Sequence, residues 1–283
     1  MRAMIDGGTK RWMARRARRW TLAGLIVWAL VGAAAARADV WTGETSASCI
    51  PAPADYDGDG DVDLSLKCGG AWHFYNDNGS YLKGIWTGGV AGDLPVPADY
   101  DGDGDADVVV FRGGAWLFFD YASGASTGGV WTGSPGIPLP LDRNGDGRAE
   151  FSVYQNGAWH FYNDNGSYLK GIWTGGLPQD IPVPGDYDGN GAEEIVIFRG
   201  GAWLFYDLDT GSNVRGVWTG AAPYGGLPLQ PAPLDYDGDG SVDFAIYAGG
   251  PLHFYQDDGA YLRGVWTGGV PDDRALSRRL LTK

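Results

Sequence analysis

The chain has 283 residues with 35 acidic and 21 basic side chains, which gives a formal net charge of −14. Residues 1–38 hold eight of the basic and one of the acidic residues, so the remainder carries 13 − 34 = −21. A surface of this sign argues against direct binding of nucleic acid or anionic lipid.

Residues 1–38 have the pattern of a secretory signal peptide. Basic residues at 10–19 precede an apolar stretch at 21–36, and Ala36-Arg37-Ala38 offers a cleavage site with small residues on both sides. We therefore predict a secreted protein, extracellular or periplasmic, with no membrane span after cleavage. An uncleaved anchor is an alternative, although the apolar run is short. Export by the twin-arginine route is another, since Arg18-Arg19 permits it.

An acidic loop of nine residues then recurs five times, beginning at Asp55, Asp99, Asp142, Asp186 and Asp235. Oxygen donors at positions 1, 3, 5 and 9, with a backbone carbonyl at position 7, suit Ca²⁺, which takes six to eight oxygen ligands. Glycine at positions 4 and 6 lets the chain curl so that the oxygens converge. The sequence therefore predicts up to five Ca²⁺ ions that contribute to the stability of the fold.

The five loops differ in charge. The first, second and fifth have aspartate at positions 1, 3, 5 and 9, and their predicted ligands are Asp55, Asp57, Asp59, Asp61 and Asp63; Asp99, Asp101, Asp103, Asp105 and Asp107; and Asp235, Asp237, Asp239, Ser241 and Asp243. The third and fourth loops carry fewer acids and are expected to bind more weakly, with Asp142, Asn144, Asp146, Arg148 and Glu150, and with Asp186, Asp188, Asn190, Ala192 and Glu194. An EF-hand is disfavoured because position 12 falls in an apolar run and is not glutamate.

The first positions of the loops are 44, 43, 44 and 49 residues apart, which indicates a repeat architecture. Each period contains four strand-like segments separated by the acidic loop, a glycine-containing turn and a polar turn, and no helical periodicity appears beyond the N-terminus. The sequence predicts an all-β fold, a β-propeller of five four-stranded blades over residues 39–270, followed by a polar tail at 271–283. An additional Trp41-Thr42-Gly43 either adds a strand that closes the ring or is the remnant of a cap.

Cys49 and Cys68 flank the first acidic loop on the two strands of its hairpin. An oxidising compartment favours a disulfide between them, which would staple the terminal blade. A metal-binding role is disfavoured because no histidine or second cysteine pair is nearby.

The pattern Asp-Tyr-Asp-Gly-Asp-Gly-x-x-Asp, followed by Phe-Arg-Gly-Gly-Ala-Trp-x-Phe-Tyr, resembles the FG-GAP (VCBS-type) repeats of bacterial secreted proteins. It is also similar to the calcium-bearing blades of integrin α-subunit propellers. The resemblance covers about residues 40–270. It implies that each loop binds one Ca²⁺ through the positions named above, and that the ring recognises a partner which the likeness does not identify.

Two repeated side chains invite a functional interpretation. Each period closes on Trp-Thr-Gly, and we expect these tryptophans, at 86, 131, 173, 218 and 266, to fill the wedge between blades, with stacking on sugar rings as the alternative. His73, His160 and His253 occupy equivalent positions in alternate blades. Equivalent positions diverge around a ring, so packing is expected for them and a shared zinc site is not.

These patterns favour a non-catalytic binding or adhesion module for an unidentified protein or glycan ligand, acting as a monomer. The alternative is a lectin with several equivalent sites between blades. A polysaccharide-active hydrolase or lyase is a more distant alternative, because nearly every candidate acid is one of five equivalents in a metal loop. No Ser-His-Asp, Cys-His or phosphate-binding glycine motif is present, so no enzymatic activity is expected.

Overall fold

The computed structural model describes residues 49–76, 78–133, 135–220, 229–248 and 250–266. The predicted signal peptide, Trp41-Thr42-Gly43, the tail at 271–283 and most of the long connection after Gly220 lie outside these residues.

The described strands form five antiparallel sheets of four strands each, which confirms the all-β, five-bladed propeller. No described residue is helical, so no described helix could span a bilayer. Within each blade the strands follow chain order. Their bounds are β1 Cys49–Pro51, β2 Leu64–Cys68, β3 Ala71–Tyr75 and β4 Tyr81–Trp86; β5 Leu94–Pro95, β6 Val108–Arg112, β7 Ala115–Phe119 and β8 Ser126–Trp131; β9 Ile137–Pro138, β10 Ser152–Gln155, β11 Ala158–Tyr162 and β12 Tyr168–Trp173; β13 Ile181–Pro182, β14 Ile195–Arg199, β15 Ala202–Tyr206 and β16 Asn213–Trp218; and β17 Gln230–Pro231, β18 Phe244–Tyr247, β19 Pro251–Tyr255 and β20 Tyr261–Trp266.

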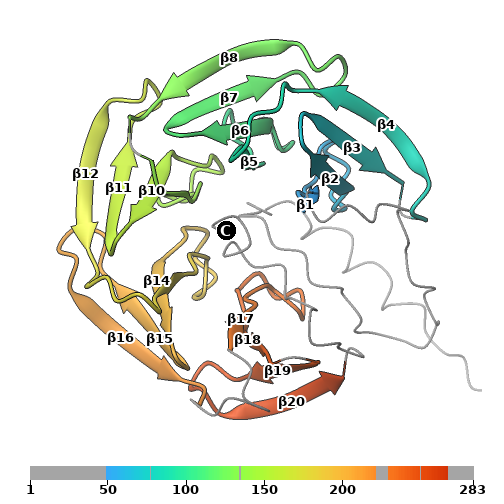
Figure 1. The fold of residues 1–283 in the computed structure, drawn as a ribbon. Coiled ribbons are helices and arrows are strands. Elements are labelled where there is room, and N and C mark those ends of the chain that lie inside the picture. The colour runs from blue at the N-terminus through green and yellow to red at the C-terminus, as the bar shows by residue number, and fades with distance from the viewer. Residues whose placement is uncertain (1–48, 77, 134, 221–228, 249, 267–283) are drawn as a thin grey trace, which may run out of the picture.

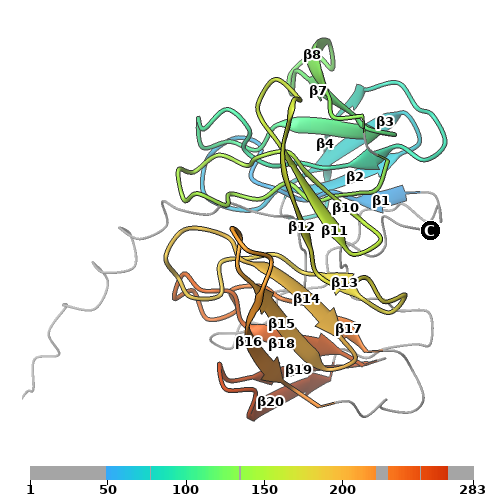
Figure 2. The ribbon, with the colours of Figure 1, turned by 90° about the vertical axis from the view of Figure 1, so that its left-hand side faces the viewer.

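Each blade runs from a short inner strand near the axis of the ring to a long outer strand on its rim (Figure 1). The acidic loop joins the first two strands, and an isolated bridge such as Ala54 to Asp63 continues their pairing as far as the base of the loop. A polar turn joins the last two strands. Because the strands alternate in direction, the acidic loops and the polar turns emerge at the same end of every blade. Figure 2 shows the same ring from the side.

The hydrophobic core lies between neighbouring blades. One face of blade 1, with Trp72 and Phe74, packs against Val108 and Val110 on the second strand of blade 2. Blade 2 repeats the arrangement with Trp116 against blade 3. The tryptophans of the third strands, Trp72, Trp116, Trp159 and Trp203, are all 0 % exposed. Aromatic side chains of this size supply most of the apolar area that holds one blade to the next.

The expectation that the Trp-Thr-Gly tryptophans fill this wedge is wrong. These five residues end the outer strands β4, β8, β12, β16 and β20, and they are 57–70 % exposed: Trp86, Trp131, Trp173, Trp218 and Trp266. The space between blades widens from the axis towards the rim, so the third strand is the outermost position at which both faces are covered. In the first four blades the threonine that follows is buried and closes the hairpin, as when Thr87 donates to the Gly70 carbonyl.

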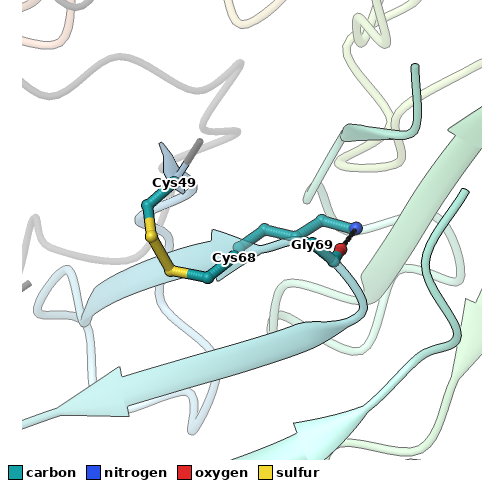
Figure 3. The surroundings of a disulfide bond; sticks show 4 residues. Cys49, Cys68 and Gly69 are labelled. Atoms are coloured by element: carbon teal, nitrogen blue, oxygen red, sulfur yellow. Dashed lines mark hydrogen bonds between the residues drawn. A yellow bond between two sulfur atoms is a disulfide. The ribbon is translucent and has the colours of Figure 1, made fainter. Parts of the chain in front are cut away.

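Cys49 and Cys68 form a disulfide across β1 and β2, with an S–S distance of 2.06 Å (Figure 3). The adjacent Lys67 is 2 % exposed and its ammonium donates to the Gly69 carbonyl. In the register with the third strand, Lys67 pairs with Trp72 as Phe111 pairs with Trp116 in blade 2. Blade 1 therefore has a buried lysine where the next blade has an aromatic ring, and a half-cystine where the next blade has Arg112.

Candidate functional site: acidic loops and an aromatic rim

Backbone amides fold each acidic loop around its carboxylates. In the first loop Gly58 and Gly60 donate to the two oxygens of Asp55, at 2.8 and 2.9 Å. Asp57 accepts from the amide two residues on, and Asp63 accepts from the Tyr56 amide at 2.8 Å. Gly58 and Gly60 have φ of 72° and 92°, a region that glycine enters without strain. These backbone hydrogen bonds thus hold the carboxylates of the loop in position.

Four of the five loops bring three carboxylates together, with one oxygen of each within 4.8 Å of the others. Positions 1, 3 and 9 meet in the first, second and fourth loops, and positions 1, 3 and 5 meet in the fifth. The groups are Asp55, Asp57 and Asp63; Asp99, Asp101 and Asp107; Asp186, Asp188 and Glu194; and Asp235, Asp237 and Asp239. Hard carboxylate oxygens at this spacing fit a Ca²⁺ ion, which binds such ligands at about 2.3–2.6 Å.

The position-5 aspartates of the first two loops, Asp59 and Asp103, lie outside these groups, as does Asp243 at position 9 of the fifth. Asp59 accepts a hydrogen bond from the amide of Asp61, and Asp103 accepts one from the amide of Asp105. At position 7 only the backbone carbonyl was predicted as a ligand. In the second, third and fifth loops the side chain at this position contacts the preceding loop.

Among the carboxyls of the acidic loops, those at position 9 have the most strongly raised pKa values. Burial, followed by repulsion from the neighbouring aspartates, raises the pKa of Asp63, Asp107 and Asp243 to about 6. The same causes raise the pKa of Glu194 to about 7. Without a cation the ionised loops therefore carry unfavourable electrostatic energy, which a divalent ion would relieve.

The third loop differs from the other four. Its Asn144 amide donates to Glu150 at 2.6 Å and to Asp146 at 3.2 Å, so an N–H group occupies the region in which the other loops gather oxygens. Arg143 replaces the tyrosine of position 2, and its guanidinium lies 3.7 Å from the Glu150 carboxylate. An internal amide and a cation thus offset part of the negative charge of the third loop.

A backbone hydrogen bond of one kind joins neighbouring loops at four junctions. The amide at position 8 of one loop donates to the carbonyl at position 1 of the preceding loop, at 2.6–2.7 Å, in the pairs Ala106 to Asp55, Ala149 to Asp99, Glu193 to Asp142 and Val242 to Asp186. In the described part of the chain the fifth and first loops have no such bond. These contacts could not be predicted from the loop pattern, because they depend on how the blades pack.

Side chains at position 7 add to the same junctions. The Asp105 carboxylate lies against Gly58 of the first loop, and Arg148 lies against Gly102 of the second. The Arg148 guanidinium also donates to the Tyr100 carbonyl at 3.0 Å. Ser241 occupies the equivalent place beside Gly189. Glycine at position 4 therefore has two functions. It adopts a positive φ, and its lack of a side chain leaves space for the side chain at position 7 of the next loop.

The second feature of the surface is the rim of exposed tryptophans. The indoles of Trp86 and Trp266 lie near a glycine turn of their own blade, since a Cβ added at Gly70 would lie 2.7 Å from the ring of Trp86 and one at Gly250 would lie 2.9 Å from that of Trp266. The polar turn of the next blade packs on the backbone beside Trp86, since a Cβ at Gly124 would lie 3.1 Å from the Trp86 amide nitrogen. The tryptophans are thus held in place while most of their surface faces solvent.

The three histidines pack against tyrosines, in agreement with the prediction, at ring-centroid distances of 5.8–6.1 Å: His73 on Tyr81, His160 on Tyr168 and His253 on Tyr261. No group of potential metal ligands among the described residues contains a histidine.

No protein-family model matches this chain, and no curated protein matches it either. Among solved structures, a lectin from Agrocybe aegerita that recognises non-reducing terminal N-acetylglucosamine aligns with 78 % of this chain and 66 % of its own, at 16 % identity and a TM-score of 0.54. The matched region thus spans about two-thirds of the lectin chain. At this identity the likeness supports the propeller fold alone.

Two further solved structures align at lower TM-scores. A protein of unknown function from Bacteroides caccae matches 77 % of this chain and 81 % of its own at 18 % identity, with a TM-score of 0.49. BBS1N in complex with ARL6DN matches 78 % of this chain and 68 % of its own at 11 % identity, with a TM-score of 0.48.

Proposed function

We propose that this protein is a secreted, calcium-binding propeller of the FG-GAP type that acts as a non-catalytic binding module, with carbohydrate as its ligand. The observation that carries the proposal is the set of five tryptophans at equivalent positions on the rim, each 57–70 % exposed. Aromatic side chains are enriched in the surfaces by which proteins bind their partners. Tryptophan is among the residues that contribute most to binding energy.

Carbohydrate is favoured because a sugar ring has an apolar face that covers an indole, and hydroxyls around its edge. The polar turns that pack beside the tryptophans offer groups for those hydroxyls; the turn of blade 2 contains Asp120 and Ser123, both exposed. The Agrocybe lectin supports the choice, since it is a protein of this fold class that recognises a sugar.

Calcium has a structural role in this proposal. The loops lie between the two innermost strands of each blade, and their hydrogen bonds join blade to blade. An ion in each loop would neutralise the clustered carboxylates and stiffen the ring that displays the rim. Catalysis is not proposed, because the perturbed acids belong to equivalent metal loops and no pair of them stands apart in a distinct environment.

The test is binding to a glycan array in calcium, with wild-type protein and with the rim variants W86A, W131A, W173A, W218A and W266A. Val214→Ser is a matched control, because Val214 is also an exposed apolar residue on an outer strand, at 65 %. We expect wild type and V214S to bind a common set of glycans and the tryptophan variants to bind them more weakly.

A protein partner is the second candidate, favoured by the same exposed surface. It would be supported if wild type bound no glycan and captured a partner whose binding the tryptophan variants lost. Full glycan binding by all five variants would refute the role given to the rim.

A further inference from the structure

The outer strands of odd and even blades differ in one respect. Those of blades 1, 3 and 5 begin with tyrosine, at Tyr81, Tyr168 and Tyr261, whereas those of blades 2 and 4 begin with Ser126 and Asn213. The three tyrosines are 57–58 % exposed. Each odd blade therefore presents two exposed aromatic residues on one strand, and each even blade presents one.

A β-bulge puts the two rings on the same side of the sheet. In blade 1, Phe74 pairs with Lys83 but Tyr75 pairs with Tyr81, so Leu82 is the additional residue. Without the bulge, Tyr81 and Trp86 would point to opposite faces, because they are five residues apart. Bulges of this kind redirect side chains. The same register shift occurs in blades 3 and 5.

Each tyrosine is fixed in a flat orientation along its strand. Its hydroxyl lies over a glycine of that strand, so that an added Cβ would be 2.5 Å from the hydroxyl oxygen at Gly171 and 2.8 Å from it at Gly264. The Tyr81 hydroxyl lies over Gly84 in the same way. In blades 2 and 4 a Cβ at Gly129 or Gly216 would meet no tyrosine. The glycine thus makes room for the ring in the odd blades.

Further ring contacts restrain the tyrosines. In blade 1 the Tyr81 ring lies 5.9 Å from His73 and 5.8 Å, edge to face, from Tyr75. Blades 3 and 5 repeat both contacts, at 5.8–6.1 Å. Side chains that are already ordered lose little conformational entropy when a ligand covers them.

The tyrosine, the glycine and the tryptophan form a strip whose ends are at most about 17 Å apart, since a strand rises 3.2–3.4 Å per residue. No side chain stands between the two rings, because the residue between them on that face is glycine and is exposed. A strip of this length exceeds one sugar ring and matches a short chain of linked rings.

We propose that blades 1, 3 and 5 each bind an extended, neutral oligosaccharide along the outer strand, with one sugar on the tyrosine and another on the tryptophan. This inference rests on the proposed carbohydrate function. Blades 2 and 4 bind only the sugar at the tryptophan. Acidic polysaccharides are disfavoured as ligands, because residues 39–283 carry a formal net charge of −21, which repels polyanions.

The test compares short and long ligands by isothermal titration calorimetry in calcium. The probes are chito-, cello-, xylo- and manno-oligosaccharides of two and six units. Wild type is compared with Y81S/Y168S/Y261S, in which the odd blades receive the serine of blade 2. A second variant, S126Y/N213Y, gives the even blades the tyrosine of the odd ones, with Gly129 and Gly216 already in place.

We expect wild type to bind the six-unit ligand of one series at least about tenfold more tightly than the two-unit ligand. The triple serine variant should lose this difference and retain the two-unit affinity, and S126Y/N213Y should bind more six-unit ligand per chain. Equal affinity of wild type for both lengths, or an unchanged length dependence in the triple variant, would overturn the extended site and leave the rim proposal standing. If neither wild type nor any variant bound a glycan on the array, the proposed function itself would fail.

Discussion

Removing calcium should destabilise this protein strongly at neutral pH. Without an ion the pKa of Asp63, Asp107 and Asp243 is about 6, and that of Glu194 is about 7. The pKa of each of these carboxyls is raised by about two units above its normal value. Ionising such a group at neutral pH therefore costs about 3 kcal/mol of folding free energy. Solvent screening at these half-buried positions reduces the cost to about 1–2 kcal/mol each. The four loops together lose about 4–8 kcal/mol, a large share of the 5–15 kcal/mol that stabilises a typical domain.

At about 2–4 °C per kcal/mol for a chain of this size, the melting temperature should fall by about 10–30 °C on chelation. The pH dependence provides a check of sign. The folded pKa of these carboxyls lies above the unfolded value near 4, so their protonation stabilises the metal-free fold at acid pH, and this contribution is lost as pH rises through about 6 to 7. Metal-stripped protein should therefore melt higher at pH 5 than at pH 7.5, and calcium-loaded protein should show the reverse order.

Differential scanning calorimetry of metal-stripped protein, with and without added Ca²⁺ at the two pH values, measures both effects, and Mg²⁺ in place of Ca²⁺ is the control for ionic strength. An unchanged melting temperature after stripping would refute the structural role given to the loops. A metal-free melting temperature that rose from pH 5 to pH 7.5 would refute the electrostatic explanation alone.

Three further predictions follow from the packing. Replacing both disulfide cysteines, in C49S/C68S, should cost about 3 kcal/mol, because the bridge closes a loop of 19 residues; calorimetry measures the loss, and an unchanged melting curve would contradict it. W116A should cost about 3–5 kcal/mol because Trp116 is fully buried, whereas W131A on the rim of the same blade should cost less than about 1 kcal/mol; equal costs would contradict the assignment of core and rim. Asn144→Asp should raise metal occupancy at limiting calcium, counted by native mass spectrometry, because it replaces the amide that now contacts Glu150. N190D in the fourth loop is the control. No change in occupancy with N144D would show that Arg143 already neutralises the carboxylates of the third loop.

The repeat, the blade and the carboxylate pattern could be predicted from the sequence because each is local. Glycines at fixed positions and alternating apolar strands specify a hairpin without reference to its neighbours, and the disulfide joins residues that face each other across one such hairpin. The exposure of the tryptophan that ends each outer strand was not predicted. It follows from the distance of that strand from the axis of the ring, which the packing of the blades decides.

One local signal did distinguish the two tryptophans of blade 1. Trp86 follows Gly84 by two residues, so its face of the strand has no large side chain beside it, whereas Trp72 is followed by Phe74 on the same face. The hydrogen bonds between loops and the contacts of Asp105 and Arg148 carried no such signal, because they form only when one blade is placed against the next. The bulge at Leu82 was likewise unpredicted, since a shift of one residue in the register leaves no trace in the composition of the strand.

The alternation between blades bears on how this ring would hold a ligand. Blades 2 and 4 share a second feature that the odd blades lack, a bidentate pair between a buried aspartate and an arginine, Asp93 with Arg112 and Asp180 with Arg199. The repeating unit is thus a pair of blades, and the extended strips recur at every second blade around the rim. Strips that face different directions cannot all contact one short chain, but they can engage a surface that displays many chains. Linked sites of this kind raise the apparent affinity about 10²–10⁴-fold without a new contact. A variant that keeps one strip, Y81S/Y168S, should therefore bind a soluble six-unit ligand with unchanged affinity per site and dissociate much faster from a surface coated with it, and equal dissociation from the surface would show that the strips act alone.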